Sequence, residues 1–271
     1  MKISFIGGGN MASALISGLA GKFTTGSNIH VVDPNPEALE RLRQAHGVTV
    51  AHEIGDDMRS SEVVVLAVKP QQMREAAALL LPQLRADTLV LSIAAGIRGA
   101  DLSRWLGGHR AIVRTMPNTP ALIGRGITGM VAMDGVSEAQ KTAADAIMKA
   151  AGQTVWLDDE ALIDPVTAVS GSGPAYVFYF LEAMQQAAVE LGLSVDQGRE
   201  LAVATFAGAA ELAARSPESL QVLRERVTSK GGTTYAAITS MEQGGVKDAV
   251  IKAVKAASAR GRELGEEMGR N

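Results

Sequence analysis

A short apolar run that stops at three glycines constrains this chain more than any other feature. Residues 3–6 (ISFI) predict a strand buried on both faces, as parallel strands are. Gly7, Gly9 and Ala12 then fit G-x-G-x-x-G/A, where the first glycine permits a tight turn and the second lets the backbone approach a pyrophosphate. The pattern predicts a dinucleotide site at the start of a helix, although glycine is also the ordinary residue of tight turns.

The residues that follow supply the context that such a site requires. A helix is predicted over 10–19 and a second strand over 28–32, and Asp33 ends that strand. A carboxylate there would accept hydrogen bonds from the ribose hydroxyls and repel a 2′-phosphate, which favours NADH over NADPH. The alternative is a simple turn residue, since Asp33 and Pro34 begin an ordinary turn sequence.

Strands and helices alternate over the first 150 residues or so, which predicts a doubly wound, mostly parallel sheet of the Rossmann type. Further strands are expected at 48–51, 63–68, 88–93 and 111–114, and further helices at 37–46 and 73–84. Ligands of such sheets bind beyond the carboxyl ends of the strands. The segments in which the chain leaves three of these strands, called strand exits below, are 67–70, 92–96 and 115–120. They are built from small or rigid residues, which suits a nicotinamide ring but also suits ordinary short loops.

The second half of the chain is almost wholly helical, and a domain boundary is predicted near residue 160. Residues 1–160 would form the dinucleotide-binding domain, and residues 161–271 would form an all-helical domain for substrate binding and dimerisation. The helix expected over 176–193 is apolar nearly all round, too apolar for a helix with one side in water. It is expected to be buried against a second copy in a homodimer.

Composition excludes several classes of function. The formal net charge is −3 without a long basic run, so neither nucleic acid nor a membrane surface is an expected partner. The chain has no cysteine, and its four histidines stand at no metal-ligand spacing, so no metal is expected. The first strand leaves no room for a signal peptide, and no apolar run is long enough to span a membrane, which predicts a cytoplasmic protein.

Two loops in the helical half, 170–174 and 228–234, combine hydroxyls and glycines before a helix. Both resemble anion-binding helix N-termini, although capping by Ser and Thr is the simple alternative. The second loop suits a small carboxylate held by backbone N–H groups. No histidine falls in a candidate loop, and Lys69 and Lys230 are the only loop candidates for a base. A cyclic imine needs no such base, because its nitrogen can arrive protonated and one hydroxyl can hydrogen-bond it.

Six stretches, in this order, resemble pyrroline-5-carboxylate reductases: residues 5–11, 67–70, 92–96, 116–120, 170–176 and 227–234. The resemblance covers essentially the whole chain. It implies reduction of 1-pyrroline-5-carboxylate to L-proline by NAD(P)H, the last step of proline biosynthesis. It also implies an intertwined homodimer, which in some members assembles into decamers.

The resemblance also assigns roles to residues. Those implied to line the cofactor, beside Asp33, are Ile6, Gly7, Gly8, Gly9, Asn10, Met11, Ala67, Val68, Lys69, Pro70, Ile93, Ala94 and Ala95. Those implied to hold the substrate are Ser229, Gly231, Gly232, Thr233 and Thr234, with Thr234 at the ring nitrogen as the catalytic residue. Many members carry Pro where this chain has Lys230, which adds a cation beside the carboxylate site.

Two other functions are compatible with a dinucleotide domain followed by helices. A β-hydroxyacid dehydrogenase would need a catalytic Lys in the helical half, and only Lys230 stands in a candidate loop. A non-catalytic dinucleotide sensor would have no use for a carboxylate-binding loop.

Overall fold

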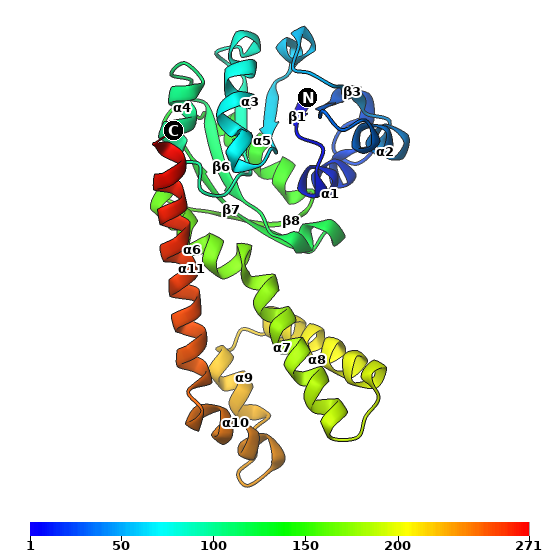
Figure 1. Cartoon of the computed structure of the whole chain (residues 1–271), viewed down its shortest axis with the longest axis vertical. Helices are drawn as coiled ribbons and strands as arrows, with labels where there is room; N and C mark the ends of the chain where they lie inside the picture. Colours follow the sequence, from blue (N-terminus) through cyan, green and yellow to red (C-terminus); the bar gives the residue numbers. More distant parts are fainter. Residues whose placement is uncertain (271) are drawn as a thin grey trace. The chain divides into compact units, whose positions relative to one another are not determined.

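The structure is a computed structural model that describes residues 1–270, and the chain divides into two compact units. The α/β unit contains residues 1–172 and the C-terminal segment from Ala256 onward, and the helical unit contains residues 173–255 (Figure 1). This division rests on contacts between residues and returns the chain's end to the α/β unit. The functional boundary near residue 160 stays a prediction.

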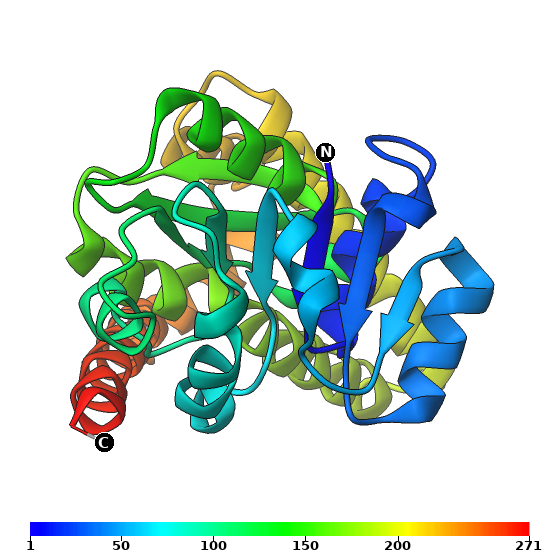
Figure 2. The same cartoon turned by 90° about the horizontal axis from the view of Figure 1, so that it is seen from above.

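A single eight-stranded sheet forms the centre of the α/β unit, in the order β3-β2-β1-β4-β5-β6-β7-β8 (Figure 2). The strands are β1 (Ile3–Ile6), β2 (Ile29–Val32), β3 (Thr49–Ala51), β4 (Val63–Leu66), β5 (Leu89–Ser92), β6 (Ile112–Met116), β7 (Gly126–Ala132) and β8 (Gly152–Trp156). The first six are parallel, whereas β7 runs antiparallel to β6 and parallel to β8. The predicted doubly wound sheet is confirmed, with two strands, β7 and β8, that run antiparallel to the other six at one edge.

The strand order reverses at β1, which pairs with β2 on one side and with β4 on the other. Ile6 is in register with both Val32 and Leu66, so the carboxyl ends of β1, β2 and β4 lie side by side. Such a reversal opens a crevice outside the strand ends, where doubly wound proteins bind ligands.

Helices cover both faces of the sheet. One face packs against α1 (Asn10–Leu19), α2 (Pro36–His46) and α5 (Glu138–Lys149), and the other packs against α3 (Met73–Leu80) and α4 (Gly99–Trp105). Because helices cover both faces at the centre of the sheet, β1, β4 and β5 are fully buried along their lengths. Helix α3 ends earlier than predicted because Pro82 lacks the N–H that would continue it. Helices α4 and α5 are not among the predicted helices.

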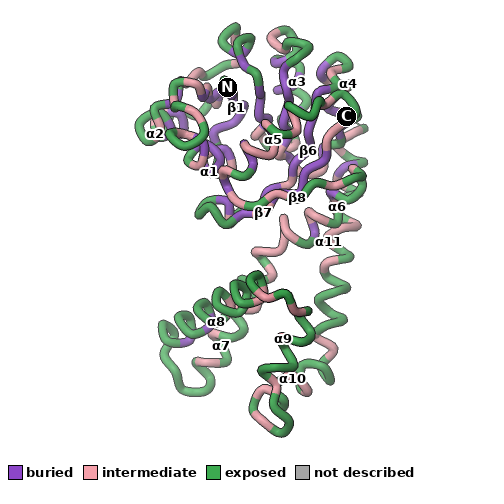
Figure 3. The backbone as a smooth tube through the Cα atoms, turned by 180° about the vertical axis from the view of Figure 1, so that it is seen from behind, coloured by how far each residue is buried: buried purple, intermediate pink, exposed green. Residues whose placement is uncertain are grey.

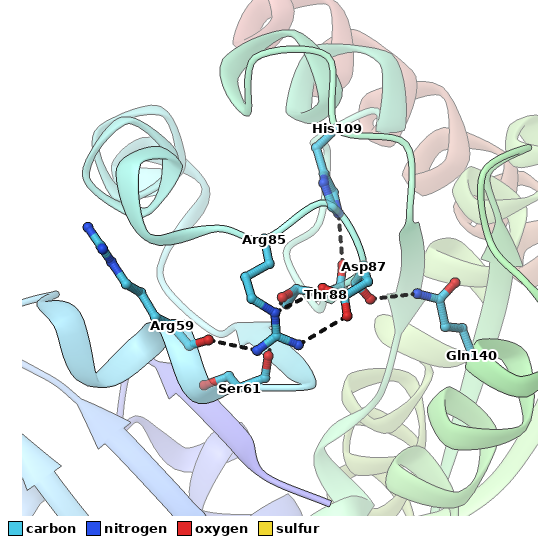
Figure 4. A network of polar contacts seen from close by, with 7 residues as sticks. All are labelled: Arg59, Ser61, Arg85, Asp87, Thr88, His109 and Gln140. Atoms are coloured by element: carbon cyan, nitrogen blue, oxygen red, sulfur yellow. Dashed lines mark hydrogen bonds and ion pairs between the residues drawn. The ribbon is translucent and has the colours of Figure 1, made fainter.

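A polar network ties the loops at the amino ends of the strands (Figure 4). Arg85 donates to Asp87 Oδ1 at 2.9 Å and to Arg59 O at 2.7 Å. Thr88 Oγ1 donates to Ser61 O at 3.2 Å, and His109 Nε2 lies 2.9 Å from Thr88 O. This network stabilises the amino ends of the strands, opposite the crevice at their carboxyl ends.

The remaining helices are α6 (Ile163–Val166), α7 (Gly173–Glu190), α8 (Val195–Arg215), α9 (Leu220–Arg226), α10 (Thr233–Gln243) and α11 (Val246–Gly269). Helix α7 begins three residues before its predicted start, because Pro174 is tolerated in a first turn. Phe180 of α7 stacks on Phe206 of α8, with ring centroids 6.5 Å apart. Within residues 1–270, no helix combines the length and apolar character needed to cross a membrane.

The apolar helix α7 is largely exposed within a single chain. None of its residues is buried, and Phe178 and Tyr179 are 60% and 72% exposed (Figure 3). The chain itself therefore does not provide the burial that the sequence of this helix predicts. Large apolar side chains on an exposed helix indicate an interaction surface.

Candidate active site

The fold requires a glycine at the first position of the turn after β1. Gly7 has φ +104° and donates its N–H to Val32 O at 2.8 Å. A Cβ atom at Gly7 would lie 2.6 Å from Ala67 O, at the end of β4. Only glycine combines this backbone conformation with such a close approach of two strand ends.

Gly9 has a different explanation, because no packing contact within the protein requires a glycine at this position. It is the N-cap of α1 with φ −70°, and a Cβ atom there would meet nothing within 4 Å. Among the described residues, no side chain caps this helix, and its first turn carries no acidic residue. Uncapped N–H groups beside an exposed glycine fit the close approach of a phosphate.

Asp33 lies beside this turn, at the end of β2. Its Oδ2 accepts the N–H of Gly8 at 2.6 Å, and its Oδ1 accepts the N–H of Asn35 at 2.8 Å. A carboxylate has about four acceptor positions, so both oxygens keep capacity for a further donor. Asp33 therefore fits the ribose-binding role and also fastens the glycine turn, a role that the sequence did not reveal.

The exit of β4 lies next to the glycine turn, and the exit of β5 lies next to that of β4. Ala67 N donates to Ile6 O at 2.8 Å, and Ile93 N donates to Leu66 O at 3.2 Å. The other predicted cofactor residues of these exits are Val68, exposed Lys69, Pro70, buried Ala94 and Ala95. The structure thus brings the glycine turn, Asp33 and both exits to one edge of the sheet, while their contacts with a cofactor stay predictions.

Asn118, at the exit of β6, has a structural role. Its Oδ1 accepts the N–H of Ile127 at 2.9 Å, and its Nδ2 donates to Ser170 O at 3.2 Å. The amide group therefore joins the start of β7 to residue 170, a structural role beside any contact with a ligand. Ser170 lies within a π-helical segment, Thr167–Gly171, and its Oγ donates to Val166 O at 3.0 Å. That serine is thus not placed at a helix N-terminus.

The second loop lies in the helical unit, between α9 and α10. Gly231 has φ +74°, and Gly232 donates its N–H to Ser229 O at 3.0 Å. Helix α10 begins at Thr233 without a side-chain cap, and Thr234 is the second residue of its first turn. Free N–H groups and hydroxyls at one helix start suit a carboxylate. Lys230 is exposed, and no hydrogen bond or ion pair engages its side chain within the described residues.

The residues that the sequence analysis missed are Arg114 and Glu160. Arg114 is only 5% exposed on β6, and its Nη1 lies 2.5 Å from Glu160 Oε1. The same oxygen accepts the N–H of Gly99, the first residue of α4, at 2.6 Å. An arginine inside a buried strand was the available signal, because a buried charge requires a partner. Within residues 1–270, no three histidine or acidic side chains gather in a way that could hold a metal ion.

Comparisons with known proteins agree with this geometry. Residues 160–264 match the family model described as pyrroline-5-carboxylate reductase dimerisation, and residues 2–96 match the one described as NADP oxidoreductase, coenzyme F420-dependent. The pyrroline-5-carboxylate reductase of Pseudomonas aeruginosa is 44% identical over 268 residues, covering 99% of this chain and 98% of that protein.

Solved structures give the same result. The pyrroline-5-carboxylate reductase of Coxiella burnetii matches with a TM-score of 0.91 at 39% identity, covering 97% of this chain and 98% of that one. The Plasmodium falciparum pyrroline carboxylate reductase, solved with NADP bound, matches with a TM-score of 0.87 at 29% identity and covers 98% of both chains. By its length, its motifs and its fold, this chain belongs to the pyrroline-5-carboxylate reductase family.

Proposed function

We propose that the chain reduces 1-pyrroline-5-carboxylate to L-proline with NAD(P)H, the last step of proline biosynthesis. The observation that carries this proposal is the 44% identity to a pyrroline-5-carboxylate reductase across nearly the full length of both chains. Identities of 44% and 41% to pyrroline-5-carboxylate reductases favour this reaction over that of a β-hydroxyacid dehydrogenase. An activity assay distinguishes the reductase from a non-catalytic dinucleotide sensor.

The α/β unit fits the cofactor. When bound, NAD(P)H supplies the hydride that the substrate accepts. The turn from Gly7 to Met11 would receive the pyrophosphate at the uncapped start of α1. Residues 67–70 and 93–95 would surround the nicotinamide end, since the exit of β4 adjoins the turn and the exit of β5 adjoins that of β4.

Asp33 supports a preference for NADH within this proposal. Its carboxylate is held in place by two backbone N–H groups, of Gly8 and Asn35. A fixed negative charge beside the ribose favours free hydroxyls and repels a 2′-phosphate. The Plasmodium falciparum relative was solved with NADP bound, so the preference for NADH is proposed for this chain and not for the whole family.

The loop before α10 would hold the substrate. Ser229, Gly231, Gly232 and Thr233 would bind its carboxylate through hydroxyls and the free N–H groups of the helix start. The hydroxyl oxygen of Thr234 would accept a hydrogen bond from the protonated ring nitrogen. The ring carbon would then accept hydride, and the nitrogen would become an amine. These residues contribute mainly by orientation, which can supply a large effective concentration.

We further propose that the chain is a homodimer or a higher homo-oligomer. The match of residues 160–264 to a dimerisation family and the exposed apolar side chains of α7 support this assembly. In an intertwined dimer, the loop before α10 would complete the partner's active site.

The test is oxidation of NADH and NADPH by the purified chain with 1-pyrroline-5-carboxylate, followed by the loss of reduced-nicotinamide absorbance, with proline identified as product. We expect turnover with both cofactors and faster turnover with NADH. Thr234→Ala should lower kcat about 100-fold, the scale of one preorganised hydrogen bond, and leave the Kd for NADH unchanged. The control is Thr142→Ala, an exposed threonine of α5, which should keep wild-type turnover. NADH binding without turnover would favour the sensor.

A further inference from the structure

The loop between β5 and α4 begins with residues that our proposal places beside the nicotinamide. It starts at Ile93, whose N–H is bonded to β4, and reaches α4 at Gly99. Gly96, in its middle, has φ +76°. What fixes this loop therefore fixes one wall of the proposed cofactor site.

The last turns of α11 lie against the middle of this loop. Gly265 is the one residue of α11 that is buried, and a Cβ atom there would lie 3.4 Å from both Gly96 O and Arg98 Nε. From the other side, a Cβ atom at Gly96 would lie 3.6 Å from Leu264 Cβ. A Cβ atom at either glycine would be in ordinary van der Waals contact with the facing segment, so the two backbones are separated by about the width of one methyl group.

Charged groups hold the same segment along the loop and α4. Arg98 Nη2 lies 3.8 Å from Glu266 Oε1. Arg104 of α4 donates to Gly269 O at 2.9 Å, at the end of α11, where a cation is favoured by the helix dipole. Met268 packs against the core cluster that contains the buried residues of α4. These contacts attach the end of α11 along the whole length of α4.

The far end of the loop is fixed independently. Glu160 accepts the N–H of Gly99 and pairs with the buried Arg114, so α4 starts from a held position. The loop is thus tied to β4 at Ile93 and to Glu160 at Gly99. Between these two points, its backbone rests on α11 at Gly265.

We propose that the C-terminal turns of α11, through Gly265 and Glu266, position the β5–α4 loop for cofactor binding. This inference rests on the proposed function, because that proposal places Ile93, Ala94 and Ala95 beside the nicotinamide. Gly265 and Glu266 are positioning residues, since they act through Gly96 and Arg98. The dinucleotide site therefore includes a segment that lies about 170 residues away along the chain.

The test compares matched glycines of the same helix. Gly265→Ala places a methyl group 3.4 Å from Gly96 O, and Gly265→Val adds two further methyl groups beside this contact. Gly261→Ala places a methyl group 3.6 Å from Asp164 Oδ1 and serves as the control. Both alanine changes favour the helix equally. The Kd for NADH is measured by titration of the purified protein without substrate, and Tm is measured on the same samples.

We expect Gly265→Val to raise the Kd for NADH about tenfold, because misplacing part of a site by a fraction of an ångström is costly. Gly265→Ala, whose methyl group makes an ordinary contact, should raise the Kd less than about twofold, and Gly261→Ala should keep the wild-type Kd. The KM for 1-pyrroline-5-carboxylate should stay unchanged in all three variants. A wild-type Kd for NADH in a folded Gly265→Val, whatever its Tm, overturns the inference.

If Gly265→Val does not fold, the Kd for NADH of two surface variants tests the inference instead. Glu266→Ala removes the pairing with Arg98 and should raise the Kd about twofold, whereas Glu263→Ala, which loses an exposed pair with Arg260, should not. In that case, a Kd for NADH of Glu266→Ala equal to that of Glu263→Ala would contradict the inference. A wild-type chain that binds neither NADH nor NADPH would instead defeat the proposed function itself.

Discussion

The backbone N–H of Gly8 donates to Oδ2 of Asp33 at 2.6 Å, so the turn after β1 is fastened to the residue that ends β2. This bond links the two parts of the proposed dinucleotide site, the pyrophosphate turn and the ribose carboxylate. A change at Asp33 should therefore affect both the affinity for either cofactor and the choice between them.

Replacing Asp33 should shift cofactor preference. Asp33→Ser removes the charge that repels a 2′-phosphate, and we expect the ratio of kcat/KM for NADPH to that for NADH to rise at least about tenfold. Affinity for both cofactors should fall, since Gly8 loses its acceptor. Steady-state kinetics with each cofactor measures the ratio. Asp134→Ser, an exposed aspartate after β7, serves as the control, and an unchanged ratio in Asp33→Ser would show that Asp33 does not select the cofactor.

The two outer glycines of the turn should respond differently to alanine. Gly7→Ala forces a side chain into positive φ against Ala67 O and should lower the free energy of unfolding by about 2 kcal/mol or more. Gly9→Ala meets no protein atom and should change it by less than about 0.5 kcal/mol. Gly9→Ala should nevertheless raise the Kd for NADH at least about tenfold, because the methyl group occupies the path of the phosphate. Urea unfolding and NADH titration measure the two effects, and wild-type affinity in Gly9→Ala would contradict the phosphate assignment.

The ion pair between Arg114 and Glu160 should matter for stability. Glu160→Ala leaves the buried guanidinium of Arg114 without its partner and should cost about 3 kcal/mol, the low end for a broken buried pair because Glu160 is 27% exposed. Glu138→Ala breaks a surface pair with Lys141 and should cost no more than about 0.5 kcal/mol. Urea unfolding compares the variants. Equal losses would mean that the Arg114 pair behaves as a surface pair.

The exposed face of α7 should carry the association of chains. Phe178→Asp places a charge among large apolar side chains and should yield monomers in size-exclusion chromatography with light scattering. Leu79→Asp alters an equally exposed leucine of α3, 56% exposed, and should leave the assembly intact. If Phe178→Asp keeps the wild-type mass while Leu79→Asp dissociates, the interface lies on the α/β unit instead.

Two histidines should make the protein less stable in mild acid. Burial lowers the pKa of His109, against the opposing hydrogen bonds to Thr88 and Ala111, and burial likewise lowers the pKa of His30, against the nearby Asp57. The unfolded chain then binds more protons than the folded one below the ordinary value of 6.5, so stability falls as pH drops through that value.

Urea midpoints between about pH 7.5 and about pH 5.5 test this effect. His109→Gln keeps a donor for Thr88 O within the network of Figure 4 and should show a smaller acid loss than wild type. His52→Gln, at an exposed histidine, should follow the wild-type curve. An identical pH dependence in all three proteins would mean that His109 does not contribute.

Local sequence was sufficient for the glycine turn, the alternation of strands and helices, and the helical second half. Each depends on residues that are close together in the chain. The glycines after the first strand predict the turn, in which Gly7 has a positive φ and α1 starts without a side-chain cap, and apolar runs predict the strands. The ordered motifs also identified the family, because their spacing over the chain is itself a sequence property. The roles assigned to Ser229 and Thr234 remain predictions.

Only the tertiary structure decided which distant groups meet. Arg114 and Glu160 are separated by 46 positions, and Gly96 meets Gly265 across most of the chain. Asn118, within the predicted strand exit 115–120, joins β7 to Ser170. Such pairings depend on the register of the strands and on where each helix ends against the sheet. No pattern of neighbouring residues encodes them, because the energy that selects them comes from burial and pairing in the assembled fold.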